Sequence, residues 1–480
     1  MAEDRAPKGK SGEKTLIRDI SFCGVPENGS NASMVDVKDG KIIRIRPMHY
    51  DWKYDPEKHM NPWKMDVRGS TFEPSMKTLI PPYSIAYKKR VYSPARIRYP
   101  MKRVDWDPSG APGSTGPGGR NPQNRGKSKY ARISWDEALD TIVSEMNRIK
   151  EKYGPTALLY QCDQHGENKV VQACHGAGRK LLPLWGGYTL QIRQPDSWEG
   201  WWWGSKHFWG CEPVGQGKQS NLLYDVAKNC ELLLFWGCDQ ETTPWGWQGQ
   251  LPSRLSYWYS ELGIKQIYVC PDLNYAAAVH ADRWIPVLPN TDAALYLAIT
   301  YWWFKNGTYD KEYLKTHAVG VEAYEAYVMG EEDGVPKTPE WASPICGVPA
   351  RVIKALAEEW ASKRTSVVIG NGGPGIRGPY ATEPARLQNI CLAMQGLGKP
   401  GINQVKMIEW GLFDFPDQYA QPKPLRVPNL RTAYTGGHPS DTNTPSLPKT
   451  YVPKAILEGQ CDWWGCESET APREDQFVHR

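Results

Sequence analysis

The sequence predicts an α/β fold in which helices cover parallel sheets, with a small β-rich domain at the N-terminus. Apolar runs of strand length, such as residues 231–236 and 266–270, alternate with segments of helical periodicity. Strands that alternate with helices in this way form parallel sheets with helices on both faces. The 480 residues are enough for roughly two or three domains, and 40% hydrophobic residues can supply their cores.

The N-terminal part has the pattern of an antiparallel domain. Residues 1–14 are polar and charged, and we expect a disordered tail there. Residues 35–46 read as two strands around Asp39-Gly40, a dipeptide typical of a two-residue hairpin turn. We therefore assign residues 15–130 to a β-rich domain that ends in a long Pro- and Gly-rich loop.

The first long helix is predicted to begin after residue 134. Ser134-Trp-Asp-Glu137 is a capping box, in which the serine accepts from a backbone amide and the glutamate reaches back. Apolar residues follow at helical spacing, and residues 157–161 are then expected to form a buried strand. Further along, the pattern predicts strands at 231–236, 266–270 and 366–370, and helices at 251–262, 291–304, 349–362 and 381–397.

These elements divide the rest of the chain into three segments. Residues 131–220 are predicted to form an α/β segment, and residues 221–400 a Rossmann-like domain. Residues 401–480 lose this order, because much of the segment is rich in Pro, Thr and Asn with few apolar runs. We expect this last segment to be rich in loops.

Composition argues against several classes of function. The net charge of +5 is spread along the chain without a dense basic stripe, so a nucleic-acid partner is not expected. No apolar run is long enough to cross a membrane, and residues 1–14 do not resemble a secretory leader, so we expect the cytoplasm. The eleven cysteines include no Cys-x-x-Cys pair, which favours free thiols in a reducing compartment. The 22 tryptophans suit flat ligands or, equally, the packing of a loop-rich surface.

Polar residues that directly follow the predicted strands are candidates for ligand binding. In open α/β sheets, ligands bind beyond the carboxyl ends of the strands. Taken singly, such a residue is more often part of a turn or a helix cap than a ligand contact. The candidates are Trp236, Gly237, Asp239, Glu241 and Thr242 after the first strand, Asp272 after the second, then Asp282, Pro289, Thr291 and Asp292, and Gly373 in a later Gly-rich turn.

The order and spacing of these groups resemble the guanosine-binding landmarks of the molybdopterin oxidoreductase (dimethyl-sulfoxide-reductase-like) family. The segment 99–103, which leads into 132–139, and the Gly-rich turn 395–401 agree with the family pattern as well. The resemblance implies that the candidates bind a bis(molybdopterin guanine dinucleotide) cofactor with molybdenum or tungsten. The sequence departs from the pattern at Asn290, where Gly is usual, and at Gln240, where Pro is common.

One segment indicates a branch of the family. Most members open with a Cys-x-x-Cys-x-x-x-Cys iron–sulfur motif, whereas here only Cys23 precedes residue 160, so no cluster is expected in this chain. Residues 194–201 resemble the pyrogallol–phloroglucinol transhydroxylase branch. The resemblance implies hydroxyl transfer on aromatic polyphenols and a small iron–sulfur partner subunit.

Carried over residue by residue, the resemblance assigns roles at the reaction centre. Ser197 falls on the metal ligand, since a hard, high-valent metal accepts an alkoxide. Asp196 and His165 fall on active-site groups that transfer protons, and Tyr419 lies near a catalytic tyrosine. Trp198 falls on an aromatic wall.

Three alternatives stay open. Cys174 and Cys211 could supply thiolate ligands, although Ser197 fits the ligand role better. A Tyr-Arg pair of the branch is absent, because residues 170–174 read Val-Val-Gln-Ala-Cys, so a reductive catechol dehydroxylase or another reductase on the same scaffold is a rival. The resemblance also implies that residues 401–480 are a third domain that is cut short and that the C-terminal half is missing. The chain could then be an inactive fragment or an aromatic-ligand binding protein.

Overall fold

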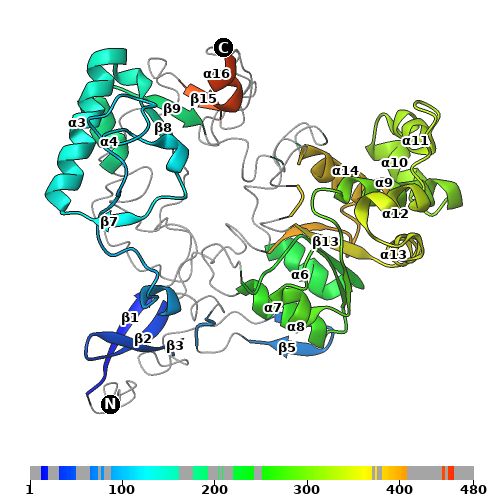
Figure 1. Cartoon of the computed structure of the whole chain (residues 1–480). Coiled ribbons are helices and arrows are strands. Elements are labelled where there is room, and N and C mark those ends of the chain that lie inside the picture. Colours follow the sequence, from blue (N-terminus) through cyan, green and yellow to red (C-terminus); the bar gives the residue numbers. More distant parts are fainter. Residues whose placement is uncertain are drawn as a thin grey trace. The chain divides into compact units, whose positions relative to one another are not determined.

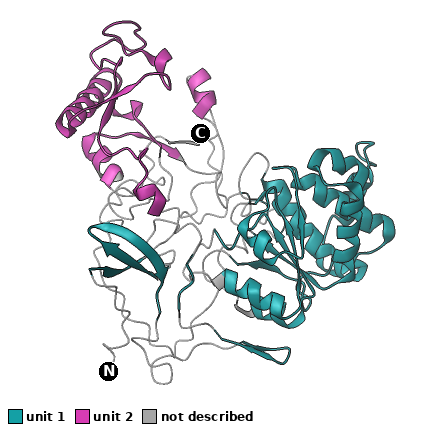
Figure 2. Ribbon diagram, turned by 60° about the horizontal axis from the view of Figure 1, so that its bottom comes forward, with its two compact units in different colours: residues 1–85, 195–425 teal, residues 86–194, 426–480 magenta. Residues whose placement is uncertain are grey.

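The chain forms two compact units. Unit 1 comprises residues 1–85 and 195–425, and unit 2 comprises residues 86–194 and 426–480 (Figure 2). These units differ from the segments of the sequence analysis, whose boundaries remain a prediction. The computed structural model (Figure 1) describes residues 12–19, 32–49, 65–73, 77–80, 88–161, 177–192, 200, 204, 208, 220–242, 251–369, 373–375, 381–407, 446–448 and 452–458.

A five-stranded parallel sheet is the centre of unit 1. Its strands lie in the order β12-β11-β10-β13-β14, and every pairing is parallel. From β10 the chain adds β11 and β12 on one side, and it then crosses to add β13 and β14 on the other. The order therefore reverses between β10 and β13, which is the topological switch point of a doubly wound sheet. The strands are β10 (Leu232–Trp236), β11 (Lys265–Val269), β12 (Arg283–Ile285), β13 (Thr365–Ile369) and β14 (Gln404–Lys406).

Helices cover both faces of this sheet. Leu232, Leu234 and Trp236 of β10 point into one apolar cluster, whereas Leu233 and Phe235 point into the other. Because both faces are buried, β10 is a continuous apolar run, as parallel strands usually are. One face carries α6 (Ser220–Asn229), α7 (Leu251–Glu261) and α8 (Tyr275–His280); the other carries α9 (Asp292–Asn306), α10 (Lys311–His317), α11 (Val321–Met329), α12 (Pro339–Cys346), α13 (Ala350–Ser362) and α14 (Thr382–Met394).

The predicted fold class is confirmed by this sheet. The predicted strands and helices of the region agree with the observed ones to within one to three residues at their ends. One detail differs, because Pro349 precedes α13 as its N-cap and is not the first residue of the helix.

A three-stranded antiparallel sheet forms the N-terminal part of unit 1. It contains β1 (Lys14–Asp19), β2 (Ala32–Lys38) and β3 (Lys41–Pro47). The predicted hairpin turn is confirmed, since Asp39 and Gly40 have φ of 49° and 72°, the positive values of a type I′ turn. Asp36 is fully buried in this sheet, and hydrogen bonds from Arg46 hold the pKa of its carboxyl well below the usual range. A short hairpin of β4 (Met65–Val67) and β5 (Ser70–Phe72) adds apolar residues to the cluster under α6.

Unit 2 contains a smaller parallel sheet with the order β15-β9-β8. Residues 157–161 were expected to form a buried strand, and this is wrong in two respects. Residues 155–157 form a 3-10 turn, and the strand that follows is partly exposed because it is short and lies at the sheet edge. The strands are β8 (Leu159–Gln161), β9 (Thr189–Ile192) and β15 (Ser446–Pro448), and the unit also holds the hairpin β6 (Met101–Arg103) with β7 (Tyr130–Arg132) and the helices α3 (Trp135–Tyr153), α4 (Ala177–Trp185) and α16 (Val452–Glu458).

Helix α3 begins at the predicted cap. Ser134 Oγ accepts a hydrogen bond from the Glu137 amide at 3.0 Å. The reciprocal half of the capping box is not formed, because the Glu137 carboxylate instead pairs with Lys102 Nζ at 2.5 Å. The start of the helix is therefore connected to the β6–β7 hairpin.

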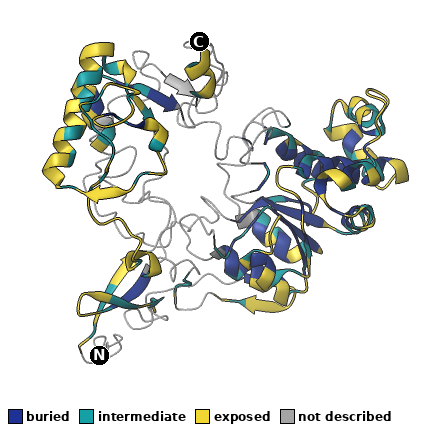
Figure 3. Ribbon diagram, viewed as in Figure 1, coloured by how far each residue is buried: buried dark blue, intermediate teal, exposed yellow. Residues whose placement is uncertain are grey.

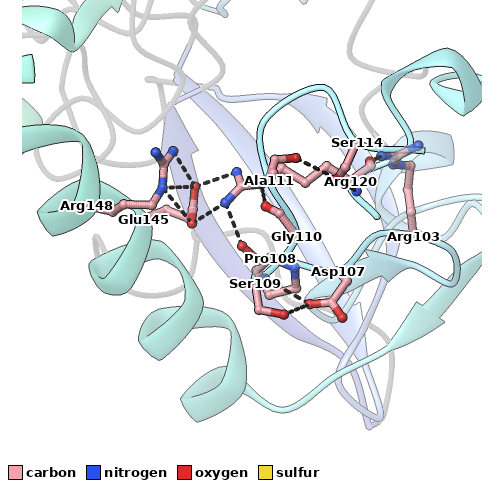
Figure 4. Close-up of polar contacts among 10 residues, drawn as sticks. All are labelled: Arg103, Asp107, Pro108, Ser109, Gly110, Ala111, Ser114, Arg120, Glu145 and Arg148. Carbon is pink, nitrogen blue, oxygen red and sulfur yellow. Dashed lines mark hydrogen bonds and ion pairs between the residues drawn. The ribbon is translucent and has the colours of Figure 1, made fainter. Parts of the chain in front are cut away.

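An ion pair holds α3 to the preceding loop (Figure 4). Both terminal nitrogens of Arg120 donate to Glu145, at 2.6 and 2.7 Å. The same guanidinium donates to the carbonyl oxygens of Pro108 and Gly110, and Arg148 donates to Glu145 at 3.0 Å. These hydrogen bonds hold the pKa of Glu145 at about 2, well below its usual value.

Much of the apolar face of α3 is exposed. Residues of this helix are all described, and none of them is buried. Trp135, Leu139, Ile142 and Val143 are 67%, 53%, 54% and 54% exposed, and Figure 3 shows exposed positions along the helix. An amphipathic helix normally turns this stripe toward a core. Within the described part of the chain, no helix is long and apolar enough to cross a membrane.

Candidate functional site

The carboxyl ends of β10 and β13 meet at the switch point of the large sheet. Gly237, which follows β10, has φ 61°, and a Cβ added to it would lie 2.3 Å from the Cα of Gly373. Gly373 belongs to the loop after β13, and the ring of Pro374 would be 3.0 Å from the same Cβ. The two loops therefore touch backbone to backbone, which only glycine allows at this distance and this φ.

Asp239 shapes the loop that follows Gly237. Its carboxylate accepts from the amides of Glu241 and Thr242, both at 3.1 Å, and from the Thr242 hydroxyl. It also accepts from the Ala276 amide at 3.3 Å, which connects the loop to the first turn of α8. The side chains of Asp239 and Thr242 thus fix the loop, as Asx turns do.

Gln240, where the family pattern has Pro, is fully buried. Its side-chain amide donates to Ser256 Oγ at 2.7 Å and to the Tyr268 hydroxyl. The Gln240 carbonyl oxygen accepts from Ser253 Oγ at 3.0 Å. A polar network under the loop replaces the rigid ring of a proline, so the departure has a structural reason.

Glu241 is paired with a histidine that the sequence analysis did not single out. His280 Nε2 lies 2.7 Å from Glu241 Oε1, and the histidine side chain is only 5% exposed. No local sequence motif marks His280, because it comes from the end of α8 and meets the loop only through the fold. Asp272, after β11, is exposed, and no described residue donates a hydrogen bond to its carboxylate.

Trp236 and Asp292 contact each other in the core beneath this edge of the sheet. The Trp236 indole N–H donates to Asp292 Oδ1 at 2.7 Å, and its ring stacks on Tyr296 with centroids 4.0 Å apart. Asp292 is 3% exposed, and this burial raises the pKa of its carboxyl to about 6. Both side chains are therefore buried, and they are hydrogen-bonded to each other.

The turn before α9 explains the other departure from the family pattern. Asn290 has φ 61°, a left-handed value that Asn tolerates better than most residues other than Gly. Thr291 Oγ1 donates to the Leu288 carbonyl oxygen at 2.6 Å, and Pro289 is exposed in the same turn. The Asn therefore preserves the turn that Gly usually forms.

Asp282 is not brought to this edge of the sheet. Its carboxylate accepts from the amide of Gln266, near the start of β11, at 2.7 Å. Asp282 directly precedes β12, so it lies at the amino end of the parallel strands. The structure thus separates it from Gly237, Asp272 and Gly373, which follow the carboxyl ends.

The residues expected at the reaction centre lie outside the described residues. They are His165, Asp196, Ser197, Trp198 and Tyr419, together with the alternative thiols Cys174 and Cys211. Within the described part of the chain, no group of three His, Cys, Asp or Glu side chains could hold a metal ion. Two glycines that the sequence analysis overlooked, Gly200 and Gly204, are described. Gly200 lies against Gly375 and Ala381, and Gly204 lies against α14; their four-residue spacing was the available signal.

Unit 2 has a concavity of about 1120 Å³ that contains none of the predicted site residues. Trp135, Ala138 and Ile142 of α3 line it, together with the β6–β7 hairpin. Arg98 and Arg125 are among its basic lining residues. It adjoins the exposed apolar face of α3, and none of its lining residues belongs to the strand-end site of unit 1, which we define by Gly237, Asp272 and Gly373.

Comparison with known proteins relates the chain to molybdopterin oxidoreductases. A model described as "Pyrogallol hydroxytransferase large subunit-like, domain 1" matches residues 31–90, and one described as "Molybdopterin oxidoreductase" matches residues 96–181. The chain is 38% identical over 464 residues to the pyrogallol hydroxytransferase large subunit of Pelobacter acidigallici, a match that covers 90% of this chain and 51% of that protein. The chain therefore contains a segment similar to molybdopterin oxidoreductases and resembles the large subunit of that hydroxytransferase over most of its own length.

More distant members of the family also match. The dimethyl sulfoxide/trimethylamine N-oxide reductase of Cereibacter sphaeroides is 30% identical over 319 residues, covering 63% of this chain and 36% of the reductase. The trimethylamine-N-oxide reductase of Haemophilus influenzae is 28% identical over 327 residues, a match that covers 65% of this chain and 37% of that reductase. The chain spans about half the length of the transhydroxylase subunit and less of the reductases. The molybdopterin oxidoreductase match over residues 96–181 implies a molybdopterin cofactor with molybdenum or tungsten.

Proposed function

We propose that this molybdopterin oxidoreductase chain is part of an enzyme that transfers hydroxyl groups between aromatic polyphenols, of the pyrogallol-to-phloroglucinol type. The observation that carries the proposal is the 38% identity, over 90% of this chain, to a pyrogallol hydroxytransferase large subunit. A small iron–sulfur subunit is the proposed partner, because that relative is named a large subunit. We keep the cytoplasm as the predicted location and expect no cluster within the chain itself.

The strand-end site fits a nucleotide-bearing cofactor, which we propose to be bis(molybdopterin guanine dinucleotide). The close contact of Gly237 with Gly373 brings the loops after β10 and β13 together at the carboxyl ends of the strands, where open α/β sheets bind their ligands. The exposed Asp272 carboxylate could accept hydrogen bonds from a ribose or guanine. We propose these three residues, with Glu241, as the direct contacts.

The other cofactor-site candidates would support the contact residues. Asp239 and Thr242 shape the loop, and the turn with Pro289 and Thr291 opens α9. Trp236 and Asp292 pack beneath the strand end, and Asp282 orders the opposite end of the sheet. Their proposed roles are thus to position the loops that face the cofactor.

At the reaction centre, the proposed roles follow the family resemblance. Ser197 would provide an alkoxide ligand, and Trp198 would stack on the phenol ring. Asp196, His165 and Tyr419 would move protons between ring hydroxyls, which acid–base groups with separated pKa values can do near neutral pH. When bound, the metal supplies Lewis acidity and, where net redox occurs, two electrons. Hydroxyl transfer from one phenol to another needs no net electrons.

A reductase acting on a catechol is the second candidate. It is favoured by the 30% identity to a dimethyl sulfoxide/trimethylamine N-oxide reductase and by the missing Tyr-Arg pair at residues 170–174. Such a reaction removes a hydroxyl group as water and consumes two electrons and two protons. The proposed iron–sulfur subunit would deliver the electrons.

Product analysis under anaerobic conditions tests the proposal. The purified protein is incubated with pyrogallol and a polyphenol hydroxyl donor, and phloroglucinol is quantified by chromatography. We expect phloroglucinol from the wild type and from a Ser362→Ala control, whose serine caps the end of α13, and a loss of at least about 100-fold in Ser197→Ala. Conversion of a catechol only with a reduced dye would favour the reductase, and no conversion with either system would refute the proposed function.

A further inference from the structure

The loop after β10 carries a glutamate whose carboxylate has a single partner among the described residues. His280 Nε2 lies 2.7 Å from Glu241 Oε1, and no other described residue donates to that carboxylate. A carboxylate only accepts hydrogen bonds, so the ring nitrogen Nε2 carries a proton and donates it. Glu241 Oε2 is left without a donor from the described part of the chain, and the Glu241 side chain is 20% exposed.

Helix α8, which ends at His280, also contacts this loop at its start. Asn274 caps the helix, and its Nδ2 donates to the carbonyl oxygen of Cys238 at 3.2 Å. The Ala276 amide donates to Asp239 Oδ1 at 3.3 Å. The loop is therefore joined to α8 near both ends of the helix, and the His280 side chain, which is 5% exposed, makes the contact at the far end.

These contacts place the glutamate close to the strand-end site. Glu241 follows Gly237 by four residues, which span at most about 14 Å of extended chain. Helix α8 begins three residues after Asp272, and β10 and β11 are neighbours in the sheet. A carboxylate repels the phosphates of a nucleotide, whereas it accepts from the N–H groups of a base or from ribose hydroxyls. The Glu241 carboxylate therefore suits the nucleoside end of a nucleotide.

We infer that His280 is a positioning residue that orients the Glu241 carboxylate toward the nucleoside end of a nucleotide bound at the strand-end site. The inference rests on the proposed function, in which this site binds a guanine dinucleotide cofactor and Glu241 is a direct contact. His280 holds Oε1, so that Oε2 can accept from the nucleoside. The histidine acts through the glutamate and does not contact the nucleotide itself.

The size of the effect follows from the freedom of the glutamate side chain. Without the hydrogen bond from His280, the Glu241 carboxylate has to be ordered when the nucleotide binds. Ordering such a side chain weakens binding by roughly threefold to tenfold. Removing the carboxylate loses a charge-assisted hydrogen bond, which weakens binding by about 10-fold to 100-fold.

Calorimetric titration of the full 480-residue chain with GDP tests this inference. The chain is produced in a host that cannot make molybdopterin, so that the probe meets no bound cofactor. We expect the Kd of GDP to rise about threefold to tenfold in His280→Leu and about 10-fold to 100-fold in Glu241→Ala. His280→Gln should stay within about twofold of the wild type, because its side-chain amide can also donate to Glu241. His317→Leu is the matched control, since His317 is an exposed histidine at the end of α10.

A double variant separates positioning from a role in the fold alone. Where Glu241 is already alanine, His280→Leu has no carboxylate left to orient and should not weaken GDP binding further. A histidine that only supports the fold would weaken binding by the same factor in both backgrounds, and this result would overturn the inference. A wild-type Kd in Glu241→Ala would overturn it too. If His280→Leu does not fold, His280→Asn takes its place, because its shorter amide does not reach Glu241.

The remaining outcomes separate this inference from the proposed function. ADP has the ribose of GDP but lacks the N1–H and the 2-amino group of guanine. An effect of His280→Leu on GDP alone assigns the contact to the base, and an effect on both nucleotides assigns it to the ribose. If the variants behave as expected but the enzyme forms no phloroglucinol, the inference stands and the proposed function fails. A wild type that binds neither nucleotide would overturn the inference together with the proposed cofactor site.

Discussion

Replacing Asp292 with Asn should stabilise the chain at neutral pH, because the buried carboxylate is costly when ionised. Asp292 is 3% exposed, and burial raises the pKa of its carboxyl to about 6. The folded-state pKa is above the unfolded value of about 3.9. The carboxyl group therefore contributes stability that is fully present below about pH 4 and is lost as the pH rises through about 6. A shift of about two pKa units corresponds to on the order of 3 kcal/mol.

Urea unfolding between pH 4 and pH 8 measures this effect. Asn keeps an oxygen that can accept from the Trp236 indole, so Asp292→Asn should be more stable than the wild type at pH 8 by up to about 3 kcal/mol. The difference should shrink toward pH 4. Asp292→Ala is the control, because it leaves the indole N–H unpaired and should be less stable than Asp292→Asn by about 1–3 kcal/mol at every pH. If the free energies of unfolding of the wild type and of Asp292→Asn changed in parallel between pH 4 and pH 8, the reasoning would be refuted.

Three further predictions concern the loop after β10 and helix α3. Gln240→Ala should lower the free energy of unfolding by about 2–3 kcal/mol in urea, because it leaves the Tyr268 hydroxyl buried without its donor; a loss under about 0.5 kcal/mol would contradict the network. Glu145→Gln should cost about 1 kcal/mol at pH 7, because the hydrogen bonds from Arg120 stabilise the carboxylate. Since the pKa of Glu145 is lowered to about 2, that cost is present above the unfolded value of about 4.3 and disappears as the pH falls through about 2; a cost independent of pH in thermal melts would argue against it. Leu139→Lys should change stability by less than about 0.5 kcal/mol, because Leu139 is 53% exposed; a loss of several kcal/mol would mean that this face is covered.

The fold of unit 1 could be predicted because its strands are unusual in composition. The five residues Leu232–Trp236 are all apolar, and such a run bounded by polar turns fits a strand that is buried on both faces. The hairpin at Asp39-Gly40 was predictable because few residue pairs adopt two consecutive positive φ values. In both cases, local chemistry alone determines the outcome.

The arrangement of the site could be predicted only in part. The rule that ligands bind beyond carboxyl strand ends selected Gly237, Asp272 and Gly373. It could not show that Asp292 accepts a hydrogen bond from Trp236, because this bond joins residues 56 positions apart and depends on how α9 packs against the sheet. Asp282 was selected by its place in a motif, yet the register of β11 and β12 puts it at the amino end.

The face of α3 shows a similar limit of sequence reasoning. Its helical periodicity predicted a helix correctly, and the same periodicity favoured burial of the apolar stripe. Burial depends on a surface for that stripe to pack against, which periodicity does not specify. The exposed Trp135 and Ile142 line the concavity of unit 2 instead.

The most direct test of the central claim is metal and guanine-nucleotide analysis of the purified 480-residue chain. Elemental mass spectrometry measures molybdenum and tungsten, and mild acid hydrolysis releases GMP from a guanine dinucleotide cofactor. We predict that one of the two metals is bound and that GMP is released with it, and that both decrease in a Gly237→Val variant, whose side chain would collide with Gly373. A folded chain that contains neither metal nor GMP would contradict the proposal that its strand-end site binds the cofactor.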